Sequence, residues 1–162
     1  THRRTQNAIL EATKELIATT GLKKMSMIEI ADVSQVSRAT LYNHYRDKDS
    51  VLLALCESEL ARLVEIAQNA SDATSALEQI SLQVSSDPAL AAMRVQDPDQ
   101  LALALTKHDD HLWKAFAIAM THLLGEGKSA LALRWLLGQA LHPISAQQSR
   151  AQAEAITGIA NL

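Results

Sequence analysis

Residues 25–51 constrain the fold of this chain most, because they divide into two very short helical segments and the start of a third. Ser26 and Glu29 have the spacing of a capping box, in which the serine hydroxyl accepts from the glutamate amide and the glutamate side chain returns to the cap. Ile30 and Ala31 then give one turn of apolar face, which residues 34–36 interrupt. A short first helix is therefore predicted after Ser26.

Two further cap residues follow. Ser37 opens a second helix over residues 38–44, and Asp47 can cap a long helix that begins at Lys48. Two helices joined by a turn of three or four residues form a helix-turn-helix, whose second helix can enter the major groove of DNA. The stretch therefore predicts this motif.

The second helix of the motif has two different faces. At about 100° per residue, Leu41 and Tyr45 fall in one narrow sector, and we expect them to pack inward with Ile30 and Val36. The opposite face carries small and hydrogen-bonding groups, where a solvated helix usually shows Lys and Glu. The side chains of this outer face are Ala39, Thr40, Tyr42 and Asn43.

Side chains of these types have partners on DNA. Asn pairs with adenine, Arg with guanine, and Ala or the Thr methyl group contacts the thymine methyl group. Lys48 adds a cation and the free N–H groups of a helix start, both suited to a phosphate. The predicted DNA-contacting residues are Ser26, Ser37, Arg38, Ala39, Thr40, Tyr42, Asn43, His44 and Lys48.

The same residues resemble a known family. Over roughly residues 3–55 the chain is similar to TetR-type transcriptional regulators. The resemblance implies an all-α protein with an N-terminal three-helix DNA-binding domain, followed by a helical domain that binds an effector and dimerises. The residues that carry it are Ala8–Ala12 with Gly21, Ile30–Ala31, Val36–Ser37, Thr40–Tyr45, Lys48 and Val51–Leu52.

One residue departs from the family pattern. Gln35 occupies the turn between the two short helices, where the family often has Gly. Glycine eases a positive φ angle, so glutamine at this position is expected to cost up to about 1 kcal/mol of backbone strain or to alter the turn.

Composition and charge fit a helical, cytoplasmic protein. Of 162 residues, 48% are apolar and 3% aromatic, and Cys56 is the single cysteine. No run of about 18 apolar residues and no signal peptide occurs, so we expect a cytoplasmic location and no membrane partner. Residues 1–50 hold eight Lys/Arg and six Asp/Glu, whereas residues 51–162 hold seven and twelve. A DNA-binding domain on an acidic remainder fits this split, and chance variation of solvated faces is the alternative.

Caps and helix breakers predict the remaining helices. We expect a helix-turn-helix DNA-binding domain at residues 1–47, and a helical effector-binding and dimerisation domain at residues 48–162. The helix at residues 47–69 would link the two domains. The expected helices are 5–20, 26–34, 38–44, 47–69, 72–84, two short ones beginning at Pro88 and Pro98, 109–125, 128–141 and 146–159.

The last two helices each carry an apolar stripe with several alanines. Small residues let helices approach closely, and paired helices from two subunits form a four-helix bundle. The resemblance implies a homodimer through these helices, and the alternative is that both stripes are filled within the monomer. The stripes are Ala130, Leu133, Leu137, Ala140 and Leu141, and Ala151, Ala155, Ile156 and Ile159.

A further set of side chains is a candidate effector pocket, because aromatic residues are scarce elsewhere in the chain. Pockets in helical bundles are apolar with a few polar groups. The i, i+3, i+7 spacing of three of these residues favours plain core packing instead. The candidates are Trp113, Phe116, Met120 and His122 on one helix, with Met93 and Trp135 on its expected neighbours.

Catalytic and metal chemistry has little support in the sequence. His108 and His111 flank two aspartates, but a third ligand is lacking and aspartate is expected there as a helix cap. No Gly-rich phosphate loop, HExxH or GxSxG motif occurs. We therefore expect no catalytic residue, no metal and no cofactor.

Together these observations predict a DNA-binding transcriptional regulator. We expect a repressor that binds a pseudo-palindromic operator as a homodimer and is released by a small-molecule effector. The alternative is a helical interaction module whose N-terminal domain binds a protein rather than DNA. An enzyme built in the C-terminal helices is a third interpretation.

Overall fold

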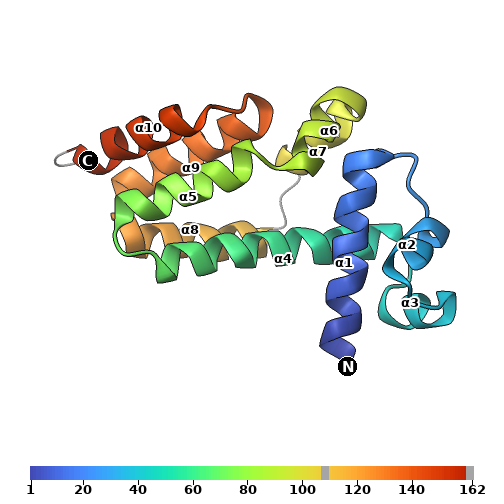
Figure 1. The fold of residues 1–162 in the computed structure, drawn as a ribbon. Coiled ribbons are helices and arrows are strands. Elements are labelled where there is room, and N and C mark those ends of the chain that lie inside the picture. Colours follow the sequence, from blue (N-terminus) through green and yellow to red (C-terminus); the bar gives the residue numbers. More distant parts are fainter. Residues whose placement is uncertain (107–109, 160–162) are drawn as a thin grey trace. The chain divides into compact units, whose positions relative to one another are not determined.

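The computed structural model describes residues 1–106 and 110–159, and every regular element among them is an α-helix (Figure 1). The predicted all-α class is confirmed. The first four helices are α1 (His2–Thr19), α2 (Met27–Ser34), α3 (Arg38–His44) and α4 (Lys48–Asn69). The others are α5 (Ala73–Ser85), α6 (Pro88–Gln96), α7 (Pro98–Thr106), α8 (Asp110–Leu124), α9 (Glu126–Leu141) and α10 (Ala146–Gly158).

Most helices begin where the predicted caps lie, whereas α1 begins at His2 and α9 at Glu126, before the expected residues 5 and 128. The Ser26 hydroxyl accepts from the Glu29 amide at 3.3 Å, and the Glu29 carboxylate accepts from the Ser26 amide at 2.8 Å. Ser37 and Asp72 cap α3 and α5 through the same kind of side-chain contact. α6 and α7 each begin at a proline. Proline lacks an N–H group, and it fits the first turn of a helix because the N–H groups of that turn have no partner within the helix.

The chain folds into two compact units whose limits differ from the expected domains. The first unit, called the head below, consists of residues 1–58 and 88–103. The second unit, called the body, consists of residues 59–87 and 104–162. The expected boundary after residue 47 lies inside the head, because α4 continues through both units without a break.

The head encloses a small apolar core. Ile9, Ile30, Leu41 and Val51, one from each of α1 to α4, have no exposed surface. Tyr45, directly after α3, is 7% exposed, so the inward face predicted for this helix is confirmed. Each of the first four helices thus contributes a fully buried aliphatic side chain to one cluster of side chains.

α6 also belongs to the head, because it packs along α1. Its residues Ala89 and Met93 are each 8% exposed. Met93 and Trp113 were expected to line one effector pocket, but the two residues belong to different units. Met93 is therefore a buried residue of the head.

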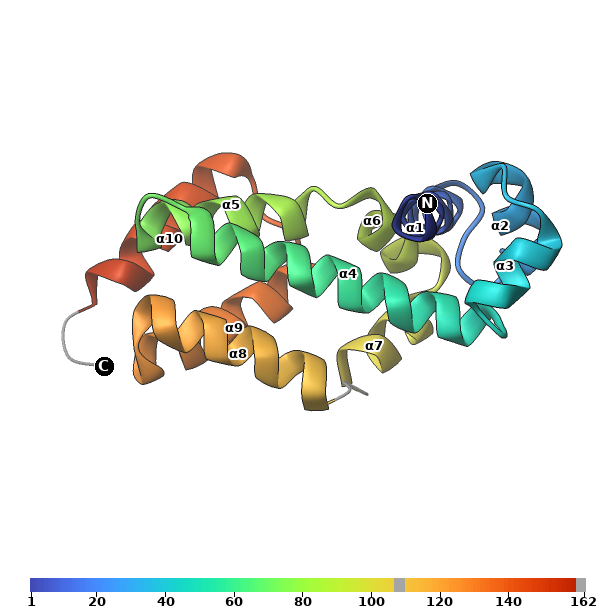
Figure 2. The same cartoon turned by 90° about the horizontal axis from the view of Figure 1, so that it is seen from below.

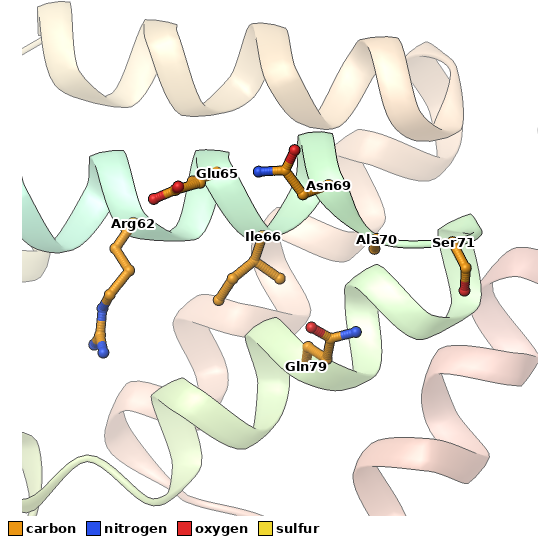
Figure 3. A pocket seen from close by; sticks show the side chains of 7 residues that line it. All are labelled: Arg62, Glu65, Ile66, Asn69, Ala70, Ser71 and Gln79. Atoms are coloured by element: carbon orange, nitrogen blue, oxygen red, sulfur yellow. The ribbon is translucent and has the colours of Figure 1, made fainter.

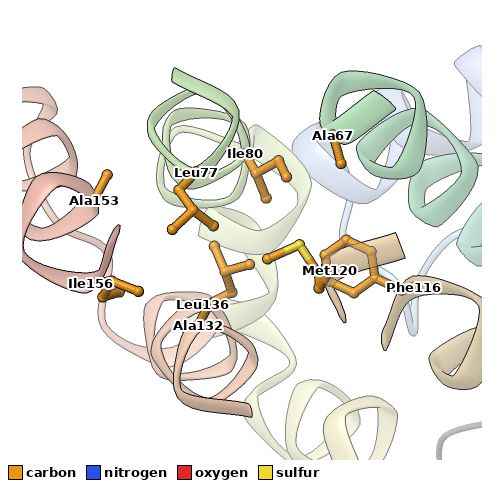
Figure 4. Close-up of a cluster of buried hydrophobic side chains, with 9 residues drawn as sticks. All are labelled: Ala67, Leu77, Ile80, Phe116, Met120, Ala132, Leu136, Ala153 and Ile156. Atoms are coloured by element: carbon orange, nitrogen blue, oxygen red, sulfur yellow. The ribbon is translucent and has the colours of Figure 1, made fainter. Parts of the chain in front are cut away.

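In the body, α5, α9 and α10 pack on one another and α8 packs on α9 (Figure 2). Phe116 and Met120 are 2% and 0% exposed, as their helical spacing favoured. Trp113 and Trp135 are partly buried against the same core. The buried members of this core, drawn in Figure 4, are Ala67, Leu77, Ile80, Phe116, Met120, Ala132, Leu136, Ala153 and Ile156.

A buried polar cluster joins three helices of the body. The Ser81 hydroxyl lies 2.6 Å from the Gln139 amide oxygen and 2.7 Å from the Ser149 hydroxyl. The Ser85 hydroxyl donates to the same amide oxygen at 2.8 Å. Because buried polar groups are costly when unpaired, these contacts favour one register of α5, α9 and α10. Within the described residues, the Gln139 amide nitrogen is buried without a hydrogen-bond partner.

The turn between α2 and α3 places Gln35 in a conformation with positive φ, which is unfavourable for glutamine. Gln35 has φ 57° and ψ 30°, in the left-handed region. Over residues 1–106 and 110–159 it is the one residue other than glycine with positive φ. Its N–H donates to the final carbonyls of α2, and the Val36 N–H donates to Ala31 at 3.1 Å. The helix ending is complete, but glutamine pays a steric cost to form it.

Gln35→Gly should therefore raise the free energy of unfolding by up to about 1 kcal/mol, because glycine has no Cβ to clash in this conformation. Urea unfolding measures the change. Gln79→Gly is the matched control, since Gln79 is an exposed residue in the interior of α5. It should lower stability by about 1 kcal/mol. Equal losses from both substitutions would show that the turn is unstrained.

Candidate nucleic-acid interface

α3 presents its predicted outer face to solvent. Leu41 is fully buried on one side of the helix, whereas Tyr42 is 52% exposed on the other. α3 is therefore a seven-residue helix that buries Leu41 on one face and exposes polar and small side chains on the other. The exposed residues are Arg38, Ala39, Tyr42 and Asn43, and Thr40 and His44 are half-buried.

Two hydroxyl groups are paired at the start of α3. The Ser37 and Thr40 side-chain oxygens lie 2.8 Å apart, and the Ser37 oxygen also accepts from the Thr40 amide at 3.1 Å. A contact between two hydroxyls uses only one of their two hydrogen atoms. The other hydrogen is left to donate to an outside acceptor, and a DNA phosphate is such an acceptor.

Ser26, also predicted to contact DNA, is engaged in its capping box. Its hydroxyl donates to the Glu29 carboxylate at 2.8 Å and accepts from the Glu29 amide. The structure therefore gives this residue a local role at the start of α2, and its contact with DNA stays a prediction.

Lys48 is held more firmly than a solvated phosphate-binding lysine. Its ammonium group donates to the carbonyl oxygens of Met25 at 2.9 Å and Lys23 at 3.3 Å, both in the loop between α1 and α2. An ammonium group has three donors, so two carbonyl contacts leave one donor for a phosphate. Its predicted DNA contact stays open, and the structure adds a second role in holding the loop.

Asp47 caps α4 as predicted. Its carboxylate accepts from the Ser50 hydroxyl at 2.7 Å and from the Ser50 amide at 2.8 Å. Arg46 donates to the same carboxylate at 3.0 Å. These hydrogen bonds, with the Ser50 contacts largest, lower the pKa of Asp47 from 3.8 to about 2. The cap is therefore ionised at neutral pH, and it fixes the chain where α3 passes into α4.

The structure adds cationic and aromatic groups that the predicted DNA set lacked. The Arg46 side chain is 91% exposed directly after α3. The imidazole rings of His2 and His44 stack with centroids 4.3 Å apart, which joins the first turn of α1 to the last turn of α3. Clustered Lys/Arg near a helix-turn-helix is the sequence signal that would have added Arg46 to the candidate phosphate contacts.

The residues expected to form an effector pocket do not line the depression that the body shows, so their role stays a prediction. The depression seen in the body has a volume of about 290 Å³ and lies between α4 and α5 (Figure 3). It is open and polar, and none of the predicted pocket residues lines it. Its lining residues are Arg62, Glu65, Ile66, Asn69, Ala70, Ser71 and Gln79.

The alanine-containing stripes of α9 and α10 are only partly available to a second subunit. Ala140 and Ile156 are 5% and 6% exposed, because they pack within the protomer. Those two residues therefore leave the candidate interface. Ala130, Leu141, Ala151 and Ala155 are exposed, and Leu133, Leu137 and Ile159 are half-buried.

Metal and membrane sites receive no support from the part of the chain that the structure describes. Across residues 1–106 and 110–159, no group of three or more His, Cys, Asp or Glu could hold a metal ion. The sequence pair His108 and His111 was the weak metal candidate, and His108 lies outside the described residues. No described helix is long and apolar enough to cross a membrane.

The geometry of α1 to α4 agrees with a family comparison. Residues 9–55 match the family model of bacterial regulatory proteins of the tetR family. The chain carries a DNA-binding domain of this family. It therefore contains the DNA-binding domain of a transcriptional regulator, and the match spans the helix-turn-helix and the first part of α4. A search of curated protein sequences found no match.

Solved structures extend the likeness beyond the TetR-type DNA-binding domain. FadR from Bacillus halodurans, a fatty acid degradation regulator, is 19% identical, with 94% of each chain covered and a TM-score of 0.71. The TetR-family repressor AlkX from Dietzia sp. strain DQ12-45-1b is 18% identical, covers 92% of this chain and 93% of its own, and has a TM-score of 0.68. AibR, solved with isovaleryl coenzyme A and operator DNA, is 16% identical, with 93% and 97% covered and a TM-score of 0.62. At these identities the likeness establishes the fold.

The Asp47 cap generates a prediction about pH. Its folded pKa lies below its ordinary value of 3.8, so its contribution to stability is present above pH 3.8 and is lost as the pH falls toward 2. Asp47→Asn keeps a cap oxygen but cannot titrate. The difference in unfolding midpoint between wild type and Asp47→Asn should therefore shrink between pH 5 and pH 2. A constant difference across this range would contradict the assignment.

Proposed function

We propose that this TetR-family regulator is a repressor that reads a pseudo-palindromic operator with α3. The observation that carries the proposal is the accessible face of α3, with Asn43 and Arg38 exposed above the buried Leu41. Asparagine and arginine are the side chains that pair best with adenine and guanine edges in the major groove. Two copies of α3 would read half-sites about 34–36 Å apart, or a multiple of that distance.

The residues around α3 suit the DNA backbone rather than the bases. Arg46 and Lys48 supply positive charge where α3 passes into α4, and the paired hydroxyls of Ser37 and Thr40 supply a donor at its start. Phosphate contacts fix the position of a protein on the duplex, and base contacts give sequence preference. We therefore assign positioning to these residues, and base reading to Arg38, Asn43 and Tyr42.

We propose a homodimer formed through α9 and α10. The support is a row of exposed small residues, Ala151 and Ala155 on α10, together with exposed Ala130 and Leu141 on α9. Small side chains allow two helices to approach closely, and a two-fold axis would pair the same surface of both copies. A dimer also supplies the two copies of α3 that a pseudo-palindrome requires.

We also propose that a small-molecule effector binds the body and releases DNA. AibR, which shares the fold, was solved with both isovaleryl coenzyme A and operator DNA. In this chain, Trp113 and Trp135 are partly buried beside the apolar core, and the Trp135 indole donates to Gln152 at 2.6 Å. Both tryptophans of the chain lie in the body, so their fluorescence reports a ligand that binds there.

Regulators of this family are generally DNA-binding proteins without enzymatic activity. We propose that this chain has no catalytic role and acts in the cytoplasm, where bacterial DNA is found. The alternative of a protein-binding N-terminal domain is less well supported, because the exposed face of α3 is polar and lacks a large aliphatic patch.

Asn43→Ala tests base reading. Operator DNA is selected from a random duplex library with the wild-type protein, and affinities are then measured by fluorescence anisotropy on that duplex and its single-base variants. Asn43→Ala should cost about 1–3 kcal/mol and should relax preference at one base position only. Arg46→Ala is the phosphate comparison, and it should weaken all sequences alike and lower the salt slope by about one unit.

Equal weakening of every sequence by Asn43→Ala would contradict the assignment of this side chain to a base. Arg46 is preferred to Lys48 as the comparison, because Lys48→Ala would also release two carbonyl contacts of the loop between α1 and α2. A wild-type protein that enriches no duplex from the library would contradict DNA reading itself.

Ala155→Glu tests the homodimer. Ala155 is exposed, so a charge there leaves the protomer core intact but would be desolvated in a close helix interface, which is unfavourable. Light scattering at micromolar concentration should show a dimer for wild type and a monomer for Ala155→Glu. Ala155→Ser is the size-matched control and should remain dimeric. A monomeric wild-type protein would contradict the proposal.

A further inference from the structure

The loop between α1 and α2, residues 20–26, is held by a segment far away in sequence. The amide of Leu22 donates to the carboxylate of Asp97 at 2.9 Å, across 75 positions of the chain. Asp97 lies between α6 and α7 and is only 3% exposed. A buried carboxylate is costly without partners, so this contact fixes the loop against the corner of α6 and α7.

Glycine is favoured at position 21 of this loop, chiefly by its backbone conformation. Gly21 has φ 96°, and a Cβ atom built there would lie 2.6 Å from the Gln96 side-chain oxygen and 3.3 Å from the Asp97 carboxylate. The first distance is shorter than real Cβ contacts, and the φ angle is one that side chains rarely adopt. A side chain at position 21 would therefore strain the backbone and would require the Gln96 side chain to shift.

A second contact on the same corner is exposed. The Lys23 ammonium donates to the Asp99 carboxylate at 2.7 Å, with the two side chains 53% and 60% exposed. This ion pair raises the pKa of Lys23 and lowers the pKa of Asp99 through their shared hydrogen bond. Exposed pairs contribute little to stability, so the buried contact of Asp97 is the stronger of the two.

The other side of the loop is bound to the DNA-reading part of the head. Lys48, in the first turn of α4, donates to the carbonyl oxygens of Lys23 and Met25. Ser26, directly after Met25, is the cap of α2. One short loop thus joins the corner of α6 and α7 to the first turn of α4 and the start of α2, the two elements that flank α3 in sequence.

We infer that Asp97 is a positioning residue for DNA binding, which acts by holding the loop of residues 20–26 and, through it, Lys48 and the start of α2. The inference rests on the proposed function, because it concerns the affinity of the same surface for DNA. Residues 88–103 belong to the head, but the chain enters them from residue 87 and leaves them at residue 104, both in the body.

The test compares two substitutions of Asp97 on the DNA duplex selected with wild-type protein. Asp97→Ala removes the acceptor for Leu22 and should weaken DNA binding by roughly 10-fold, since a buried amide is left unpaired. It should also lower the salt slope by about one unit, because Lys48 is no longer held in place for its phosphate. Asp97→Asn retains an oxygen that can accept from Leu22, and it should restore affinity to within about 2-fold of wild type.

Thr13→Ala is the control for lost stability. Thr13 is fully buried in α1, and its hydroxyl bonds only to the Ile9 carbonyl of its own helix, remote in sequence from the loop. It should lower the unfolding midpoint but leave the salt slope unchanged. Hydrogen exchange at the Leu22 amide should accelerate in Asp97→Ala but not in Thr13→Ala.

Unchanged affinity and salt slope in folded Asp97→Ala would overturn the inference while leaving DNA reading intact. A loss of affinity shared by Thr13→Ala at an unchanged salt slope would overturn it as well, because stability alone would then account for the effect. If Asp97→Ala does not fold, Asp97→Glu keeps the charge but displaces the acceptor, and the same loss of salt slope is expected. Failure of the wild-type protein to bind selected DNA would instead refute the proposed function.

Discussion

Burial of a few aliphatic side chains decides whether the DNA-reading surface exists. α2 and α3 have eight and seven residues, and isolated helices shorter than about 12–15 residues are marginal in water. Their stability therefore comes from packing, in which Ile30 and Leu41 are fully buried, and α2 packs on both α1 and α3. The same burial orients α3, because fixing Leu41 inward turns Asn43 outward at helical spacing. One face of α3 thus stabilises the helix by burial, and the opposite face is left exposed for recognition.

Much of the head was predictable because its signals are local. Ser26, Ser37 and Asp47 each accept from an amide three residues away, and the strained φ of Gln35 follows from the turn that two such helices require. The contact of Asp97 with Leu22 was not predictable in this way. The sequence shows Asp97 as an ordinary cap before Pro98, and nothing local indicates an amide 75 positions away as its partner. Nothing local in the sequence indicates either that α6, which carries Met93, packs on α1.

The body shows a different limit of sequence reasoning. The spacing of Phe116 and Met120 allowed either core or pocket, and only their exposure of 2% and 0% decides for the core. The cluster around Gln139 has no sequence signature, because Ser81, Ser149 and the glutamine come from three helices that meet only after folding. Such polar contacts restrict helix register more than they add to stability. The candidate DNA residues were foreseeable from residue type and helix face, whereas an effector site was not.

The head consists of two separate stretches of sequence, and this affects how a chimaera with a related regulator must be built. A chimaera that transplants residues 1–58 as a cassette would leave behind residues 88–103, and with them Asp97 and the α6 surface that covers α1. The transplanted helices would keep the side chains proposed to read bases, but they would lose the α6 surface that packs on α1. DNA specificity can therefore be transferred by substituting the exposed side chains of α3, because these side chains do not depend on the α6 surface. Transfer of the whole head must include both of its stretches, residues 1–58 and residues 88–103.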